Sequence, residues 1–450
     1  MNKVLLTSTL AAALGGLLFG YDTVIINGAM LDLVRHFHLS PQMHGWTVSS
    51  ALVGCILGTM FIGKVGDKFG AKLMLKIFAV MFFASSSGCA IAENIGVFIL
   101  FRFIGGLAIG ASSVICTTYI AEISPPKHRG LLAATFQLAI VVGILMSLIS
   151  NYLLLNIGDQ NWRWMMFSGA IPAVLFFLML FFIRNSPRWL VKSGRIDEAR
   201  KNIEDLSSFE IDSEQTITEI QYSIHSEKTG KGINLFKKPF RKIIYIGIFV
   251  GIFNQLTGIG VVFYYSSQIF SIAGFSNGTS MIQSVILGLT NLVFTLIAMS
   301  VIDKLGRKKI LLAGQIGMFI VLGLFGYGLL SGNIGGYWLV ALLVVYIAFF
   351  AASQGAVVWV LLSEMFPNVI RARGASVGSL ANWIVSASLN FLFPVVIGLF
   401  GTTQAAQQLG LSYAFIFLAI LTFIGYIYLK RYIIETKGKT LENIEKEVLY

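Results

Sequence analysis

The sequence predicts an all-α membrane protein with twelve transmembrane helices arranged in two pseudo-symmetric six-helix halves. Three observations lead to this prediction: an apolar composition, twelve apolar runs of spanning length, and two motifs that each occur once per half. Of the 450 residues, 56% are hydrophobic and only 12% are charged, and the mean hydropathy is +0.79. A soluble protein of ordinary composition carries about twice that charged fraction.

Twelve runs are long enough to cross a hydrocarbon core of about 30 Å, which takes about 20 helical residues. We place them at 4–30, 46–63, 73–92, 97–120, 131–155, 164–184, 243–272, 280–302, 310–330, 337–364, 375–400 and 412–430. The first run starts like a signal peptide but continues past the expected cleavage point, so we expect a retained helix.

The formal charge of +12 could indicate nucleic-acid binding, but the positions of the basic residues argue against it. Thirty of the 33 Lys and Arg residues fall on one side of the predicted topology, whereas Arg35 and Arg163 fall on the other and Arg102 lies within a span. The positive-inside rule places that basic side, and with it both termini, in the cytoplasm. We therefore expect a lipid bilayer and no nucleic acid as a partner.

One long polar interval, 185–242, divides the chain into an N-terminal six-helix half (1–184) and a C-terminal half with a cytoplasmic tail (243–450). Its segments 196–206 and 214–225 are amphipathic enough to form short cytoplasmic helices. The Asp-Lys-x-Gly-x-Lys motif at 67–72 recurs at 303–308, and Glu-x-x-Pro-x-x-x-Arg at 122–129 recurs at 364–371. This duplication is the architecture of secondary transporters whose two halves rock around a central site.

The repeated motifs bring carboxylates and guanidinium groups to the predicted cytoplasmic face. We expect them to form an ion-pair network that acts as a gate, tying the halves together in one transport state; ordinary anchoring at the membrane interface is the alternative. The predicted members are Asp67, Glu122, Arg129, Arg188, Asp303, Arg307, Glu364 and Arg371.

Two charges lie deep in apolar runs, Asp22 in the first and Arg102 in the fourth. A charge in hydrocarbon is expensive and usually faces an interior pathway, where it serves function. We interpret the two as a proton-coupling or ion-coupling pair. A purely structural ion pair that holds two helices together is the alternative.

The other polar residues in the spans are mostly carboxamides, accompanied by aromatic rings. They are Gln137, Asn254, Gln255, Asn291 and Asn382, with Trp359, Trp383, Tyr264 and Tyr265. Carboxamides both donate and accept hydrogen bonds to hydroxyls, and flat aromatic faces suit the C–H side of a sugar ring. As a set they predict a site for a neutral polyol, although helix–helix hydrogen bonding explains any single amide better. The histidines lack zinc-ligand spacing and no catalytic motif is complete, so we expect no metal, no cofactor and no enzyme activity.

Six motifs occur in a characteristic order along the chain. They are Gly-Gly-Leu-Leu-Phe-Gly-Tyr-Asp at 15–22, Tyr-Ile-Ala-Glu at 119–122, Trp-Arg-Trp at 162–164, Ser-Pro-Arg-Trp-Leu at 186–190, Asp-x-x-Gly-Arg-Lys at 303–308 and Glu-Thr-Lys-Gly at 435–438. In these the chain resembles, over nearly its whole length, the sugar porter family of the major facilitator superfamily. Within that family it is similar to bacterial D-xylose:proton symporters and related hexose transporters.

The resemblance implies a monosaccharide transporter of a bacterial inner membrane. Gln137, Gln255, Asn291, Trp359 and Trp383 match sugar-site positions of the family, with Phe19, Tyr264 and Gly355 as neighbours. Asn382 and Ile144 match glucose carriers and differ from the D-xylose symporter, which favours a hexose. Asp22 stands where proton-coupled members have an acid, and Arg102 matches its partner.

Some positions depart from the family pattern and leave the sugar and the inner gate open. Asn254 replaces the first Gln of a Gln-Gln pair, and Gly260 replaces an Asn that contacts sugar. Gly355 lacks the proline that usually follows it, and Arg184-Asn185 replaces Pro-Glu at the end of the sixth span.

We therefore expect a monomeric secondary active transporter that imports a monosaccharide, a hexose before a pentose, by proton symport and alternating access. A proton-independent sugar facilitator is the first alternative. A sugar sensor that does not transport ranks below both.

Overall fold

The computed structural model describes residues 3–125, 128–206, 212–229, 234–332, 336–367, 369–433 and 435. The regular elements among these residues are all helices, and twelve helices or consecutive helix pairs are long and apolar enough to span a membrane. This confirms the predicted all-α class and the twelve spans.

The first six spans contain seven helices. These are α1 (Lys3–His36), α2 (Pro41–Phe69), α3 (Ala71–Ile91), α4 (Ile95–Ile123), α5 (Arg129–Leu154), and α6 (Asn161–Ser168) followed by α7 (Ala170–Met179). Three short helices follow: α8 (Pro187–Lys192), α9 (Ile196–Leu206) and α10 (Ser213–Thr229). Helices were predicted at 196–206 and 214–225, whereas the single turn of α8 has too few residues for periodicity to reveal it.

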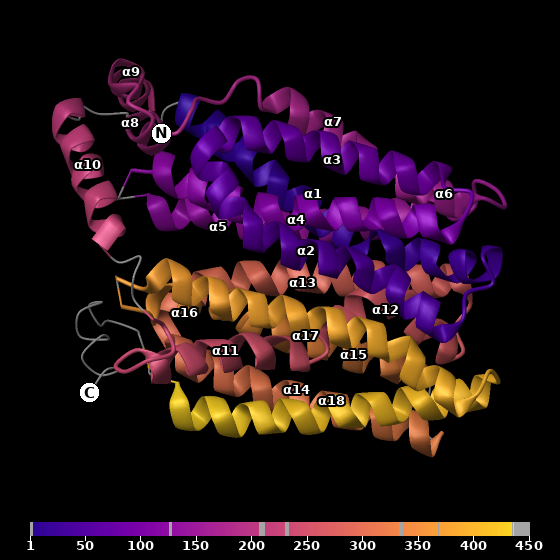
Figure 1. Ribbon diagram of the computed structural model, residues 1–450. Coiled ribbons are helices and arrows are strands. Elements are labelled where there is room, and N and C mark those ends of the chain that lie inside the picture. The colour runs from indigo at the N-terminus through magenta and orange to yellow at the C-terminus, as the bar shows by residue number, and fades with distance from the viewer. Residues whose placement is uncertain are drawn as a thin grey trace. The chain divides into compact units, whose positions relative to one another are not determined.

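The last six spans are built from nine elements. They are α11 (Arg241–Leu256) with α12 (Ile259–Ile272), α13 (Asn277–Leu305), α14 (Arg307–Ser331), α15 (Gly336–Phe350) with a π-helical turn η2 (Ala351–Gly355) and α16 (Ala356–Glu364), α17 (Arg371–Phe400) and α18 (Gln404–Tyr432). Two of these spans are interrupted, one at Gly258 and one at η2. Figure 1 shows the order of the elements and, in the C-terminal part, α14 running alongside α18.

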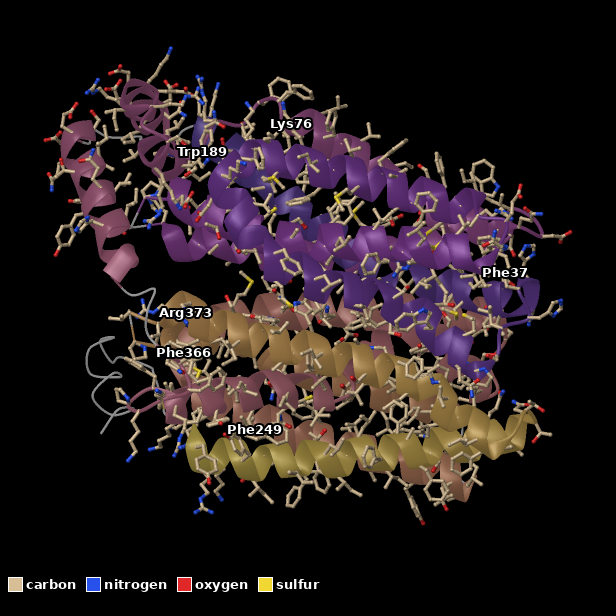
Figure 2. The ribbon with its side chains drawn as sticks, in the orientation of Figure 1. Phe37, Lys76, Trp189, Phe249, Phe366 and Arg373 are labelled. Carbon is tan, nitrogen blue, oxygen red and sulfur yellow. The ribbon has the colours of Figure 1, made fainter. Side chains whose placement is uncertain are left out.

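The repeated Asp-x-x-Gly motif forms the same turn in both places where it occurs. Gly70, between α2 and α3, has φ 79°, and Gly306, between α13 and α14, has φ 90°. A residue with a Cβ is strained in this left-handed region, so glycine permits the sharp reversal into the next helix. The Trp189 ring packs against Gly70, and Figure 2 labels Trp189 on α8. The Glu435 carboxylate occupies the corresponding place beside Gly306.

The described chain packs into two compact units. Unit 1 contains residues 1–23, 53–147 and 163–233; unit 2 contains 24–52, 148–162 and 234–450. The boundary between the units passes through α1, α2 and α5, so that part of each of these helices packs with the C-terminal helices. The division at 184 and 243 that the sequence suggests stays a prediction.

In unit 1, glycines let helices approach closely. A Cβ on Gly20 of α1 would meet the Ile140 carbonyl oxygen of α5, and one on Gly143 of α5 would meet that of Leu17 on α1. Gly54 and Gly58 of α2 have the same relation to the backbone of α4. Such small-residue contacts are the usual way in which membrane helices pack, because lipid provides no hydrophobic drive for association.

The short helices α8, α9 and α10 form a small apolar core of their own within unit 1. It consists of Leu190, Val191, Ala199, Ile203 and Ile217, with Trp189 packed against it. The amphipathic pattern that predicted two of these helices therefore has its apolar side buried among them.

Candidate functional site

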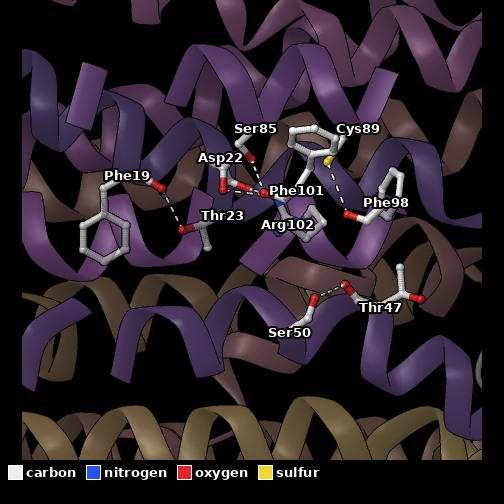
Figure 3. Close-up of polar contacts among 10 residues, drawn as sticks. All are labelled: Phe19, Asp22, Thr23, Thr47, Ser50, Ser85, Cys89, Phe98, Phe101 and Arg102. Carbon is white, nitrogen blue, oxygen red and sulfur yellow. Dashed lines mark hydrogen bonds and ion pairs between the residues drawn. The ribbon is translucent and has the colours of Figure 1, made fainter. Parts of the chain in front are cut away.

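Asp22 and Arg102 form an ion pair inside unit 1, between α1 and α4. The Arg102 Nη1 atom donates to Asp22 Oδ2 at 3.1 Å and to the Asp22 backbone oxygen at 3.2 Å. Arg102 is 0% exposed and Asp22 is 4% exposed, so both charges are withdrawn from solvent. Figure 3 shows the pair with Ser85 and Phe101 beside it. The sequence predicted both residues, and the structure brings them together.

Helix packing around this pair depends on Gly105, one turn after Arg102 on α4. A Cβ at Gly105 would press on the Ser85 hydroxyl and lie 3.6 Å from Asp22 Oδ2. The Ser85 hydroxyl donates to the Phe101 carbonyl oxygen at 2.8 Å, which ties α3 to the same turn of α4. The absence of a side chain at Gly105 thus lets three helices meet around the buried charges.

A second polar cluster lies in unit 2, where α11 meets α17. The Gln255 Nε2 atom donates to Asn382 Oδ1 at 3.3 Å, and Asn382 Nδ2 donates to Asn254 Oδ1 at 2.9 Å. Asn254 and Asn382 are each 2% exposed, whereas Gln255 is half-buried. Three of the predicted amides are therefore hydrogen-bonded to one another, with Gln255 the most accessible of them.

The chain geometry explains why the amides gather at this place. Asn254 and Gln255 lie in the last turn of α11, directly before the break at Gly258, whose φ is 85°. Gly251 on α11 and Gly378 on α17 lack side chains where their helices meet, and a Cβ on Gly251 would meet the Gly378 carbonyl oxygen. Interrupted helices at the middle of a membrane are typical of substrate sites in transporters.

The other predicted substrate residues lie on several elements. In unit 2, Tyr264 on α12 and Asn291 on α13 are 4% and 5% exposed, Gly355 ends η2, Trp359 on α16 is 38% exposed, and Trp383 on α17 is half-buried. In unit 1, Phe19 on α1 and Gln137 on α5 are half-buried and Ile144 on α5 is buried. That these residues contact a sugar stays a prediction.

Two polar residues of unit 2, Gln354 and Asn27, were not predicted from the sequence but form hydrogen bonds with other buried groups. Gln354, in η2, is 1% exposed, and its Oε1 accepts from Asn254 Nδ2 at 3.5 Å. Asn27 on α1 donates to the Ser266 hydroxyl at 2.9 Å and accepts from the Ser267 amide at 3.0 Å. Each stands as a lone carboxamide in an apolar run, which is the signal that could have revealed it.

Within each unit, predicted gate residues form ion pairs and hydrogen bonds. In unit 1, Asp67 pairs with Lys192 at 2.7 Å, and Glu122 accepts from the Ser186 hydroxyl and lies 3.9 Å from Arg188 Nε. Lys192 was not among the predicted members. The side chains of Arg129 and Asp303 lie outside the described residues.

In unit 2, Arg307 donates to Glu364 Oε1 at 3.1 Å, and Arg371 donates to the Phe366 carbonyl oxygen at 3.2 Å. Glu435 accepts from the backbone amides of Arg307 and Lys308, at 2.9 and 3.1 Å, and so caps the start of α14. It belongs to the Glu-Thr-Lys-Gly motif, of which 436–438 lie outside the described residues. A role of these clusters as a gate stays a prediction.

Comparison with known proteins agrees with this arrangement of interrupted membrane helices and buried polar clusters. The family model described as "Sugar (and other) transporter" matches residues 8–448. The chain is 35% identical to the arabinose-proton symporter of Bacillus subtilis (strain 168), over 99% of this chain and 95% of that protein. It is 36% identical to the glucose transport protein of Synechocystis sp. (strain ATCC 27184 / PCC 6803 / Kazusa), over 98% of this chain and 97% of that protein.

Among solved structures, the partially occluded inward-open conformation of the xylose transporter XylE from E. coli superposes with a TM-score of 0.85. Sequence identity is 31%, and the match covers 98% of this chain and 100% of that one. The fold is thus that of the major facilitator transporters, and the protein is an integral membrane transporter rather than an enzyme. The chain belongs to the sugar transporter family.

The ion pairs Arg307–Glu364 and Lys192–Asp67 differ in burial, so removing one partner of each should change stability by different amounts. The side chains of Arg307 and Glu364 are 12% and 26% exposed, whereas those of Lys192 and Asp67 are 40% and 62% exposed. We expect Glu364→Gln to lower stability by roughly 1–3 kcal/mol, because a largely buried guanidinium loses a charged partner. Asp67→Asn, the matched control, should cost less than about 1 kcal/mol because water screens that pair. Thermal unfolding in detergent measures both, and an equal or larger loss in Asp67→Asn would contradict the interpretation.

Proposed function

We propose that the protein imports a monosaccharide together with protons, by alternating access of two halves across a bacterial inner membrane with both termini in the cytoplasm. The observation that carries the proton-coupling part is the buried ion pair between Asp22 and Arg102. It is supported by relatives named as proton symporters, for arabinose in Bacillus subtilis and for D-xylose in Escherichia coli (strain K12). The distribution of basic residues supports the orientation.

The chemistry proposed for Asp22 is reversible protonation. When its carboxylate takes up a proton, the charge that attracts the Arg102 guanidinium disappears, and the 3.1 Å pair loses most of its Coulomb energy. The Arg102 guanidinium then loses its charged partner, which favours a different packing of α1 against α4. A proton can in this way bias the equilibrium between two packings of the helices.

The sugar is proposed to bind at the accessible end of the amide cluster. Gln255 offers a carboxamide to the hydroxyls, and Trp359, a residue that is 38% exposed, offers an aromatic ring. Residues Asn291, Tyr264, Gly355 and Trp383 of unit 2 are proposed to complete the site. Within unit 1, Phe19, Gln137 and Ile144 remain predicted sugar contacts. Binding of sugar and binding of a proton then both stabilise the state that closes over the sugar.

The proton-coupling proposal predicts a specific defect in Asp22→Asn. Reconstituted into liposomes with an imposed inward proton gradient, wild type should accumulate labelled sugar and Asp22→Asn should not, because the amide cannot take up a proton. The variant should still exchange internal for external sugar in counterflow, since the amide cluster is unchanged. Asp32→Asn serves as matched control, because Asp32 lies on the same helix and its side chain is 20% exposed.

Failure takes two distinguishable forms in this assay. If wild type equilibrates sugar but never accumulates it under the gradient, the protein is a proton-independent facilitator. If Asp22→Asn accumulates sugar as well as wild type does, the symport is coupled at another residue.

We further propose that the sugar is a hexose, since Ile144 and Asn382 match glucose carriers. Purified protein should bind D-glucose at least 10-fold more tightly than D-xylose. Ile144→Gln should narrow that ratio, because a donor and an acceptor enter a buried apolar position. Ile149→Gln, at a position 38% exposed on the same helix, is the control and should leave the ratio unchanged. Tighter binding of the pentose by wild type would contradict the preference.

A further inference from the structure

Four carboxamides of unit 2 form a chain of hydrogen bonds in which each amide donates to the next one. Gln255 donates to Asn382, Asn382 donates to Asn254, and Asn254 donates to Gln354, at 3.3, 2.9 and 3.5 Å. In each link the nitrogen of one amide meets the oxygen of the next. The four residues come from α11, α17 and η2, so the chain crosses three elements far apart in the sequence.

A backbone carbonyl also favours this direction, at Asn382. Asn382 Nδ2 also donates to the Gly251 carbonyl oxygen, at 3.2 Å. Because a backbone carbonyl can only accept, this bond favours the orientation in which the Asn382 nitrogen faces Gly251 and Asn254 while its oxygen faces Gln255. The close approach of Gly251 to α17 makes this contact possible, since a Cβ there would lie 3.3 Å from the Asn382 backbone nitrogen.

The direction has consequences at both ends of the chain. At the accessible end, Gln255 uses its nitrogen toward Asn382, so its oxygen Oε1 remains the acceptor; it lies on the side of Gly260, 3.4 Å from a Cβ placed there. At the buried end, Gln354 contributes an oxygen, while its Nε2 is a buried atom with no hydrogen-bond partner among the described residues. Gln354 therefore acts in the chain as an acceptor alone.

We propose that Gln354 is a positioning residue for sugar recognition: through Asn254 and Asn382 it holds the Gln255 carboxamide so that its oxygen, and not its nitrogen, faces the substrate. The site then selects a sugar hydroxyl that donates a hydrogen bond. This inference rests on the proposal that Gln255 contacts the sugar. Without the acceptor at Gln354, Asn254 loses the partner that orients its nitrogen, and the amides nearer the substrate are held less firmly in one orientation.

Fluorinated sugars test the direction of the hydrogen bond, because a C–F group cannot donate. Binding to purified protein is measured for D-glucose and for its 2-, 3-, 4- and 6-deoxyfluoro analogues, or for D-xylose and its analogues if the pentose binds more tightly. In wild type, at least one analogue should bind at least 10-fold more weakly than the parent sugar. In Gln354→Met, which keeps the side-chain volume, that loss should shrink to less than about 3-fold, since Gln255 can then turn its nitrogen to the fluorine.

Two further variants separate positioning from packing. Gln354→Glu restores an acceptor oxygen and should restore the wild-type selectivity. Gln315→Met is the matched control: Gln315 on α14 is 0% exposed, and both of its amide atoms lack a hydrogen-bond partner among the described residues. It should leave the selectivity unchanged. Thermal unfolding of each variant shows that it is folded.

The inference is overturned if Gln354→Met keeps the wild-type pattern of analogue affinities, or if it weakens all sugars by one factor. The variant Gln255→Ala distinguishes a wrong role for Gln354 from a wrong assignment of the sugar site. If Gln255→Ala leaves D-glucose affinity unchanged, Gln255 is not a sugar contact, and the proposed site fails together with the inference. If Gln255→Ala weakens binding and Gln354→Met does not change the pattern, only the role of Gln354 is wrong.

Discussion

The ion pair between Asp22 and Arg102 is the constraint around which unit 1 is built. Either charge alone in this setting would cost several kcal/mol, so α1 and α4 must stay packed while both residues are ionised. Gly105 provides the room for that contact, and Ser85 ties α3 to the same turn. A change that neutralises one partner therefore acts on the packing of the helices as well as on one side chain. A proton is the smallest ligand that can make such a change.

Unit 2 also buries polar side chains, but its amide cluster contains no ion pair. Its hydrogen bonds join neutral carboxamides, whose desolvation costs less than that of ions and whose orientation can be set by backbone and side-chain acceptors. Such a network suits a neutral, hydroxyl-rich ligand, since it can be stable before binding and still present a defined donor or acceptor. The proposed mechanism thus assigns coupling to a charge pair in one unit and recognition mainly to amides in the other.

Much of the fold follows from the sequence because the membrane limits the choices. Backbone groups in hydrocarbon must bond within their own helix, so apolar runs of about 20 residues identified all twelve spans. Asp22 and Arg102 were found because deep charges are rare. The breaks within spans were not predicted: the φ of Gly258 and the π-helical turn at 351–355 leave no mark on hydropathy. Gln354 and Lys192 were missed because their importance depends on Asn254 and Asp67, which lie about a hundred residues or more away in the chain.

In the proposed mechanism, sugar and proton each raise the affinity of the protein for the other, through Asp22. Its most direct test is the number of protons taken up when sugar binds to purified protein, measured by titration calorimetry in buffers of different ionisation enthalpy. We expect net proton uptake by wild type at a pH where Asp22 is ionised in the sugar-free protein, and none by Asp22→Asn. Sugar binding without proton uptake at any pH, or identical uptake by wild type and Asp22→Asn, would contradict it.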